Sequence, residues 1–342
     1  MLIGKREISP MQPALIIAEI GINHGGSLNE AKRIVEKAAE AGAECVKHQT
    51  HFVEDEMTVE AKHVYPPNAD KSIWEVIESC ALGRDDEVAL MEFSRSLGLI
   101  YLSTPFSRSA ADFLHEIDVP AFKIGSGEND NHLLLEHIAR LGRPIIMSTG
   151  MQDLNSLRPA VEIMKDHSVD FCLLECTNMY PCPPENISLK GLSDLREAFD
   201  TDLVGFSDHS DEMTMAISAL ALGSVVVEKH FTDSKDRIGP DISSSMDTTD
   251  LANLIRWSKE IHFSLNNAKK REPVEEAVYR FARSSLVADL DIKKGDKFTK
   301  QNLWARRPGN GEIAGFEVNR YLGKVATRNI AQGEQIKRDD IG

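Results

Sequence analysis

The sequence has little positive charge, few cysteines and no long apolar run. Its 342 residues include 39 lysines and arginines against 54 aspartates and glutamates, which gives a formal net charge of -15. This charge repels a phosphate backbone and the basic residues form no stripe, so we expect no nucleic-acid partner. A site for an anionic small molecule would have to be built locally from a few placed lysine or arginine side chains.

The cysteines are too few and too irregular for a disulfide framework, which predicts a reducing compartment such as the cytoplasm. The five are Cys45, Cys80, Cys172, Cys176 and Cys182. Cys172 and Cys176 fall on one side of a predicted strand and are expected to pack in the core. The apolar run at residues 15–21 is too short for a signal peptide or a membrane span, so we expect neither an export signal nor a membrane partner.

Common catalytic motifs are also missing. The sequence has no G-x-S-x-G elbow, no Walker loop and no HExxH pair, which disfavours hydrolase and kinase functions. The run at residues 125–128 is a short turn that is too weak to indicate a nucleotide site.

What the sequence does contain is a regular alternation of short apolar runs with amphipathic stretches. The runs are rich in Val, Ile and Leu and show no strict alternation, as expected of parallel strands buried on both faces. About eight such units predict a (β/α)8 TIM barrel over residues 1–265. The insertion at 51–83, with its Tyr65-Pro66-Pro67-Asn68 turn, is long enough to act as a lid.

A second, smaller domain is expected because the chain exceeds the length of one typical core. The polar, charged stretch at 266–283 is typical of a linker. The remaining residues, 284–342, contain a weak repeat in which an Ile-x-x-Gly-acidic turn starting at Ile292 recurs at Ile330, and they predict a small β-rich unit.

Polar side chains gather at the carboxyl ends of the predicted strands, where barrel active sites form. Lys47 and Lys123 would be costly there without an anion, and phosphate or carboxylate is the natural counter-ion. The hydroxyls of Thr104, Ser126 and Ser148 lie at neighbouring strand ends, although any one of them is more often structural.

Two histidines, His209 and His230, end consecutive predicted strands and could together bind a divalent metal. Hydrogen bonding within a polar rim is the alternative role. Barrel closure would bring Glu19 beside His230, either near the metal and substrate or as a salt-bridged residue. Asp241, on the loop after the last strand, could contact a substrate hydroxyl or simply form a turn.

A set of ordered motifs spans nearly the whole chain and resembles the bacterial sialic acid (N-acetylneuraminate) synthase family. The motifs are AEIGINHGGS, KHQTH, STPFSRSAADFL, FKIGSGE, STGM, CTNMYP, GFSDHS, EKHFT and GPDISSSMD. The segments LDIKKGDKF and LWARRPGNG resemble that family's C-terminal antifreeze-like (SAF) domain.

The resemblance implies a condensation of phosphoenolpyruvate with an amino-sugar aldehyde, N-acetylmannosamine first among the candidates. It implies Mn2+, with Mg2+ or Co2+ as alternatives, on His209 and His230. Phosphoenolpyruvate would then be held by Lys47, Lys123, Thr104, Ser126, Ser148, Asn178 and Gln49. The sugar would meet Glu19, Tyr180 and Asp241, and Glu128 would be a proton-transfer partner. In a domain-swapped homodimer, Arg307 and Phe281 would reach the sugar bound by the other subunit.

Two departures from the family pattern leave the acceptor open. The segment NDNHLL follows Glu128 where close relatives resemble CNNYPL, and Cys182 stands where they commonly carry Thr. A legionaminate-type synthase and an N-acylneuraminate-9-phosphate synthase are therefore alternatives within the class. Outside it, a carbohydrate- or ice-binding module with a silent barrel and a barrel metallohydrolase are the competing hypotheses.

Overall fold

A computed structural model describes residues 1–65 and 70–342 of the chain, which form two compact units, Met1–Asn267 and Ala268–Gly342. The predicted turn at residues 65–68 lies outside the described residues from Pro66 onward. No helix in the described part of the chain is long and apolar enough to cross a membrane.

The first unit is built on eight parallel strands, which confirms the predicted barrel. Their order is β5-β4-β3-β10-β9-β8-β7-β6, so the last strand pairs with the first. The strands are β3 (Leu15–Gly21), β4 (Cys45–Thr50), β5 (Ile100–Pro105), β6 (Phe122–Ile124), β7 (Ile145–Ser148), β8 (Phe171–Cys176), β9 (Val204–Asp208) and β10 (Val226–His230).

The barrel is nearly closed. β5 and β6 lie beside each other, but within the described chain no ladder of hydrogen bonds joins them. The pairing of β10 with β3 aligns His230 with Glu19, two residues that are distant in the sequence. The strands are buried on both faces, as their continuous apolar runs predict.

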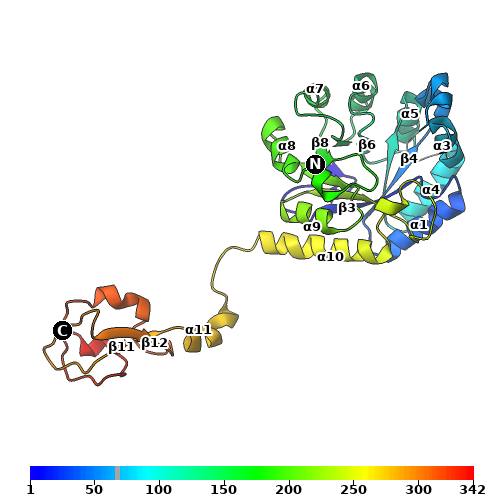
Figure 1. Ribbon diagram of the computed structural model, residues 1–342. Coiled ribbons are helices and arrows are strands. Elements are labelled where there is room, and N and C mark those ends of the chain that lie inside the picture. The colour runs from blue at the N-terminus through cyan, green and yellow to red at the C-terminus, as the bar shows by residue number, and fades with distance from the viewer. Residues whose placement is uncertain (66–69) are drawn as a thin grey trace. The chain divides into compact units, whose positions relative to one another are not determined.

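Helices surround the strands, and their apolar faces pack on the barrel (Figure 1). Several begin at the polar caps expected of helix N-termini, among them Ser27, Ser107 and Asn131. The main helices are α1 (Leu28–Glu40), α4 (Arg84–Ser96), α5 (Arg108–Glu116), α6 (His132–Arg140), α7 (Arg158–Asp166), α8 (Gly191–Phe199), α9 (Thr214–Ala221) and α10 (Thr248–Leu265). The predicted lid carries α2 (Val53–Glu56), η1 (Val59–His63) and α3 (Ile73–Cys80), and two short 3-10 turns are η2 (Pro184–Asn186) and η3 (Ile242–Ser244).

A small N-terminal hairpin, β1 (Leu2–Ile3) and β2 (Arg6–Glu7), fills the amino-terminal end of the barrel. Ile3 and Ile8 are buried in one apolar cluster with strand residues such as Leu15 and Val226. Because this end is plugged with apolar side chains, polar chemistry in the barrel is confined to the opposite end.

The second unit has its own apolar core and contains the repeat that the sequence predicts. Ile292 and Ile330 pair with each other through two backbone hydrogen bonds, and Gly295 and Gly333 both adopt positive φ. Its elements are η4 (Pro273–Glu275), α11 (Glu276–Ala282), β11 (Ser285–Ala288), β12 (Leu303–Arg306), η5 (Gly315–Arg320) and η6 (Arg338–Asp340). The segment expected to be a linker therefore contains a short helix.

Candidate active site

A cavity of about 140 Å3 opens at the carboxyl ends of the barrel strands. Most of the residues that the sequence singles out line it together, although they come from many different strands and loops. They are Glu19, Lys47, Gln49, Thr104, Lys123, Ser126, Ser148, Asn178, Tyr180, His209 and His230.

On one side of the cavity, a hydrogen-bonded chain runs from β3 to the lid segment. The Lys47 ammonium lies 2.7 Å from Glu19 Oε2 and donates to Thr104 Oγ1 at 3.0 Å. The Gln49 amide donates to Glu19 Oε1 at 2.9 Å, and its oxygen faces His51 Nε2 at 3.1 Å. His51 in turn contacts Glu56 at 2.8 Å and stacks on a cavity aromatic ring. Each polar group is thereby fixed in orientation by the next.

On the other side, Lys123 projects from β6 and connects to β7 and β10. Its ammonium donates to Ser148 Oγ at 2.7 Å and lies 3.4 Å from Glu228 Oε1. The Ser207 hydroxyl donates to the same carboxylate at 3.3 Å. Glu228 stands two residues before His230, so both side chains point into the barrel.

The buried charges shift one another's protonation. Burial raises the pKa of Glu19 to about 7, against the opposing charge of Lys47. Burial also lowers the pKa of Lys123, whereas for Glu228 the charges of Lys123 and Lys47 outweigh burial and lower the pKa. Near neutral pH Glu19 is therefore close to its midpoint, whereas its surroundings favour the ionised form of Glu228. The two buried amino groups of Lys47 and Lys123 suit an anionic ligand.

His209 and His230 face each other with ring centroids 5.5 Å apart. Burial lowers the pKa of His209 to about 4 and that of His230 to about 3, so both rings are neutral at pH 7. The Thr177 carbonyl accepts a hydrogen bond from His209 Nδ1 at 2.9 Å, which leaves His209 Nε2 as a free lone pair. His230 Nδ1 has no hydrogen-bond partner among residues 1–65 and 70–342. This donor set fits a divalent metal.

The loop after β8 places Asn178 and Tyr180 over the cavity. The Tyr180 ring lies 4.2 Å from the His209 ring, and burial raises its hydroxyl pKa. Gly150 makes room for this arrangement, because a Cβ at that position would come within 1.9 Å of Asn178 Oδ1 and 2.7 Å of Ser126 Oγ.

Four sequence-predicted residues lie elsewhere. Asp241 is outside the cavity lining but beside it, with Oδ2 3.7 Å from His230 Nδ1, and burial raises its pKa to about 6. Glu128 lines a neighbouring hollow and accepts a hydrogen bond from Asn131 at 2.8 Å. Phe281, on α11, and Arg307, just after β12, belong to the second unit, where both are exposed.

The sequence reasoning missed cavity residues that share a strand face with residues it found. Glu228 and Ser207 lie two positions before His230 and His209, and Phe106 follows β5 directly. Cys176 was expected in the core with Cys172, yet it lines the cavity 3.7 Å from His209 Nδ1. The two-residue period of the strands was the signal that could have found Glu228, Ser207 and Cys176.

The model of the NeuB family matches residues 34–270, which is more than half of the chain. The chain belongs to the NeuB family. A SAF domain matches residues 283–342, within the second unit. Both expectations drawn from the sequence motifs, a sialic acid synthase-type barrel and an antifreeze-like C-terminal domain, are confirmed.

Relatives with named activities match most of the chain. An N,N'-diacetyllegionaminic acid synthase of Campylobacter jejuni is 36% identical over 96% of this chain and 100% of its own. The human N-acetylneuraminate-9-phosphate synthase is 31% identical over 98% of this chain and 94% of its own. A crystal structure of the sialic acid synthetase of Leptospira borgpetersenii, 29% identical, superimposes with a TM-score of 0.74 over 82% of this chain and 95% of that one. These similarities favour a synthase over a metallohydrolase or a binding module with a silent barrel.

Proposed function

We propose that this enzyme condenses phosphoenolpyruvate with an N-acylated amino-sugar aldehyde to give a sialic acid-type sugar acid and phosphate. The observation that carries the proposal is the pair of buried ammonium groups, Lys47 on β4 and Lys123 on β6, which line one cavity in a NeuB-family barrel. A molecule with both a phosphate and a carboxylate offers one anionic group to each lysine. The hydroxyls of Thr104 and Ser148 already touch those ammonium groups and would donate to the same ligand.

Proton uptake would accompany binding of this anion. Glu19 is near its midpoint at neutral pH, and an incoming phosphate beside Lys47 would compete with the carboxylate for that ammonium. Protonation of Glu19 removes the competition and leaves a carboxylic acid that can donate a hydrogen bond. In the condensation, C3 of phosphoenolpyruvate bonds to the aldehyde carbon and the aldehyde oxygen gains a proton. Water then adds to the cation left at C2 and loses a proton, and cleavage of the C2–O bond releases inorganic phosphate and leaves a ketone at C2.

A divalent metal, with Mn2+ the first candidate and Mg2+ or Co2+ the alternatives, would be held by His209 and His230. Both rings are neutral at pH 7, and each has a free nitrogen lone pair. No group of three or more His, Cys, Asp or Glu side chains within the described ranges could hold a metal by itself, so water and substrate would complete the coordination. When bound, such an ion supplies Lewis acidity toward the acceptor carbonyl.

Metal binding can be tested without activity. Titration of Mn2+ into the apo-protein, followed by calorimetry, should give one site per chain that His209→Gln or His230→Gln abolishes. His115→Gln, an exposed histidine on α5, is the matched control and should bind normally. Unimpaired binding by both cavity variants would reject this assignment.

The acceptor is the finer part of the proposal. The resemblance of the sequence motifs makes N-acetylmannosamine the first candidate, whereas identities of 36% and 35% to two diacetyllegionaminic acid synthases favour a 2,4-diacetamido-6-deoxy sugar. A panel of these two sugars and N-acetylmannosamine 6-phosphate, each with phosphoenolpyruvate and Mn2+, should show release of phosphate with one clear preference. Release of phosphate without any sugar, or after complete chelation, would contradict the proposal.

A domain-swapped homodimer would complete the sugar site. We propose that Arg307 and Phe281 act on the acceptor bound in the barrel of the other subunit, in line with the family resemblance. Arg307→Ala should then raise the KM for the sugar more than the KM for phosphoenolpyruvate, with Arg320→Ala, another exposed arginine of the same unit, as the control. Equal losses for both substrates would argue against this placement.

A further inference from the structure

The loop between β10 and α10, residues 231–247, carries Asp241 to the edge of the cavity beside His230. Its two ends are joined, because Met246 N donates to the His230 carbonyl at 2.8 Å and Thr232 N donates to the Met246 carbonyl at 3.0 Å. The position of Asp241 therefore depends on what holds the residues between these ends.

The inner part of the loop is held by one buried asparagine that lies more than 200 residues earlier in the sequence. Asn23, in the β3–α1 connection, donates through Nδ2 to the Phe231 carbonyl at 3.0 Å and to Ser245 Oγ at 3.1 Å. The Ser245 hydroxyl then donates to the Asp241 carbonyl at 2.8 Å. Asn23 is 6% exposed and Ser245 1% exposed, so water does not compete with these bonds. One amide thus connects the end of the His230 strand to the Asp241 backbone.

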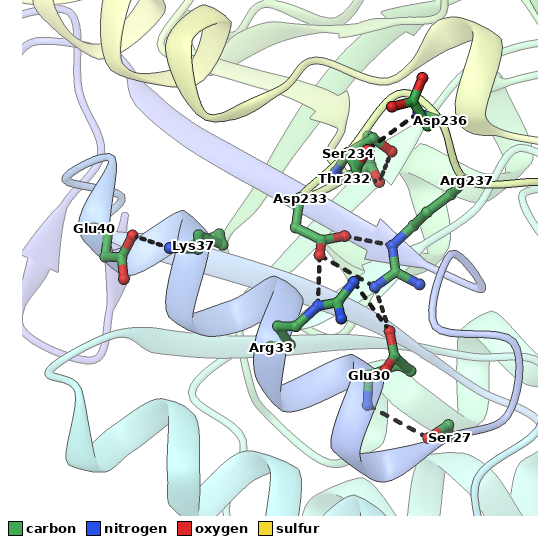
Figure 2. Close-up of polar contacts among 10 residues, drawn as sticks. All are labelled: Ser27, Glu30, Arg33, Lys37, Glu40, Thr232, Asp233, Ser234, Asp236 and Arg237. Carbon is green, nitrogen blue, oxygen red and sulfur yellow. Dashed lines mark hydrogen bonds and ion pairs between the residues drawn. The ribbon is translucent and has the colours of Figure 1, made fainter.

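The outer part of the loop is held to α1 by alternating charges (Figure 2). Figure 2 shows the guanidinium groups of Arg33 and Arg237 between two carboxylates, with Asp233 above them and Glu30 below. Arg33 Nε lies 2.7 Å from Asp233 Oδ2, and Arg237 pairs with both Asp233 and Glu30. The Asp233 side chain is only 7% exposed, which distinguishes this cluster from an ordinary surface ion pair.

We infer that Asn23 and Ser245 are positioning residues that set the distance between Asp241 and His230. The ion pairs of Asp233 are a second set of contacts, which hold the outer part of the same loop to α1. The inference rests on the proposed function, together with the sugar contact that the family resemblance implies for Asp241. Neither Asn23 nor Ser245 lines the cavity. Their effect should therefore appear in acceptor binding, without a matching loss of phosphoenolpyruvate binding on the lysine side.

Ser245→Ala tests the inner contacts, which are the hydrogen bonds made by Asn23 and Ser245. It removes the hydroxyl that joins the Asn23 amide to the Asp241 carbonyl, and we expect the acceptor KM to rise about fivefold while the phosphoenolpyruvate KM stays within twofold. Ser258→Ala is the matched control, since Ser258 is a buried α10 residue whose hydroxyl donates to the Ala14 carbonyl away from the loop. Ser245→Thr, which keeps the hydroxyl, should recover at least part of the loss.

The same change in an Asp241→Asn background shows whether the effect passes through Asp241. If it does, adding Ser245→Ala to the Asp241→Asn variant should raise the acceptor KM little further. A full additional fivefold loss in that background, or an equal rise of both KM values in the single variant, would overturn the inference.

Hydrogen exchange provides a readout that does not depend on the synthase proposal. Ser244 and Ser245 amides bond to carbonyls within the loop at 3.2 and 3.1 Å, and Ser245→Ala should speed their exchange while Ser258→Ala should not. Arg237→Ala should speed exchange mainly at residues 233–237. If neither Ser245→Ala nor Arg237→Ala changes exchange in the loop, these contacts do not hold it in place. Faster exchange in a protein that has no activity toward any sugar would instead support them and count against the proposed function.

Discussion

Replacing Lys123 with methionine tests whether the cavity is organised by its buried charges. The substitution keeps an unbranched side chain of similar length but removes the ammonium that meets Glu228 at 3.4 Å and Ser148 at 2.7 Å. Glu228 is 5% exposed and would lose the nearest cation on its side of the cavity. It would remain in a site where burial opposes its ionised form.

Breaking a buried ion pair by removing one partner costs about 3–5 kcal/mol of folding free energy. Water can enter the adjoining cavity and Lys47 still attracts the carboxylate, so we expect about 3 kcal/mol, the lower end of that range. In the double variant Lys123→Met/Glu228→Gln no charge is left unpaired by the change. About 2 kcal/mol of the loss should therefore be recovered, since contacting residues of this kind are energetically coupled.

Urea unfolding of the full chain at pH 7, followed by far-ultraviolet circular dichroism, measures both variants. Lys37→Met is the control and should unfold like the parent protein, because Lys37 lies on α1 outside the cavity and its side chain is 41% exposed. Binding of phosphoenolpyruvate should be lost in the single and the double variant alike. A double variant no more stable than Lys123→Met would show that the carboxylate and the ammonium are not coupled and would refute this account of the cavity.

Three further predictions follow from individual contacts. Gly150→Ala should raise the KM for phosphoenolpyruvate by about tenfold, measured by steady-state kinetics, because its Cβ displaces the Asn178 amide. His51→Phe keeps an aromatic ring but removes the nitrogens facing Gln49 and Glu56, so kcat/KM should fall several-fold and thermal unfolding should show a lower midpoint. Burial, with the charge of Asp194 adding to it, raises the pKa of Glu175 to about 7, so its contribution to stability is present below pH 4.5 and is lost as the pH rises through 7. Glu175→Gln should therefore stabilise the fold at pH 8, by at most about 3 kcal/mol, and leave it unchanged at pH 4, as denaturation at the two pH values would show.

Much of the barrel could be anticipated from local pattern. Buried parallel strands need continuous apolar runs, and active-site residues of a barrel follow those runs, so Lys47, Lys123, His209 and His230 could be found without a structure. The two-residue period of a strand would also have found Glu228, which stands two positions before His230 on the same face.

Local pattern does not place residues whose position depends on loops. Glu128 follows a strand closely, yet the turn after β6 directs it into a neighbouring hollow, where it meets Asn131. The tie between Asn23 and Ser245 joins residues 222 positions apart, and nothing in either local sequence indicates it.

The amino-acid sequence determined the strand and helix periodicity, the family and the kinds of side chain available at the barrel's polar end, because these depend on neighbours a few residues away. The closure of the barrel, and with it the position of His230 beside Glu19, could also be anticipated from the number of strands. Only the tertiary structure decided how deeply these side chains are buried and which polar groups they contact, and that burial shifts the pKa values of both. Desolvation depends on the packing of the whole folded barrel, and a linear pattern does not contain it.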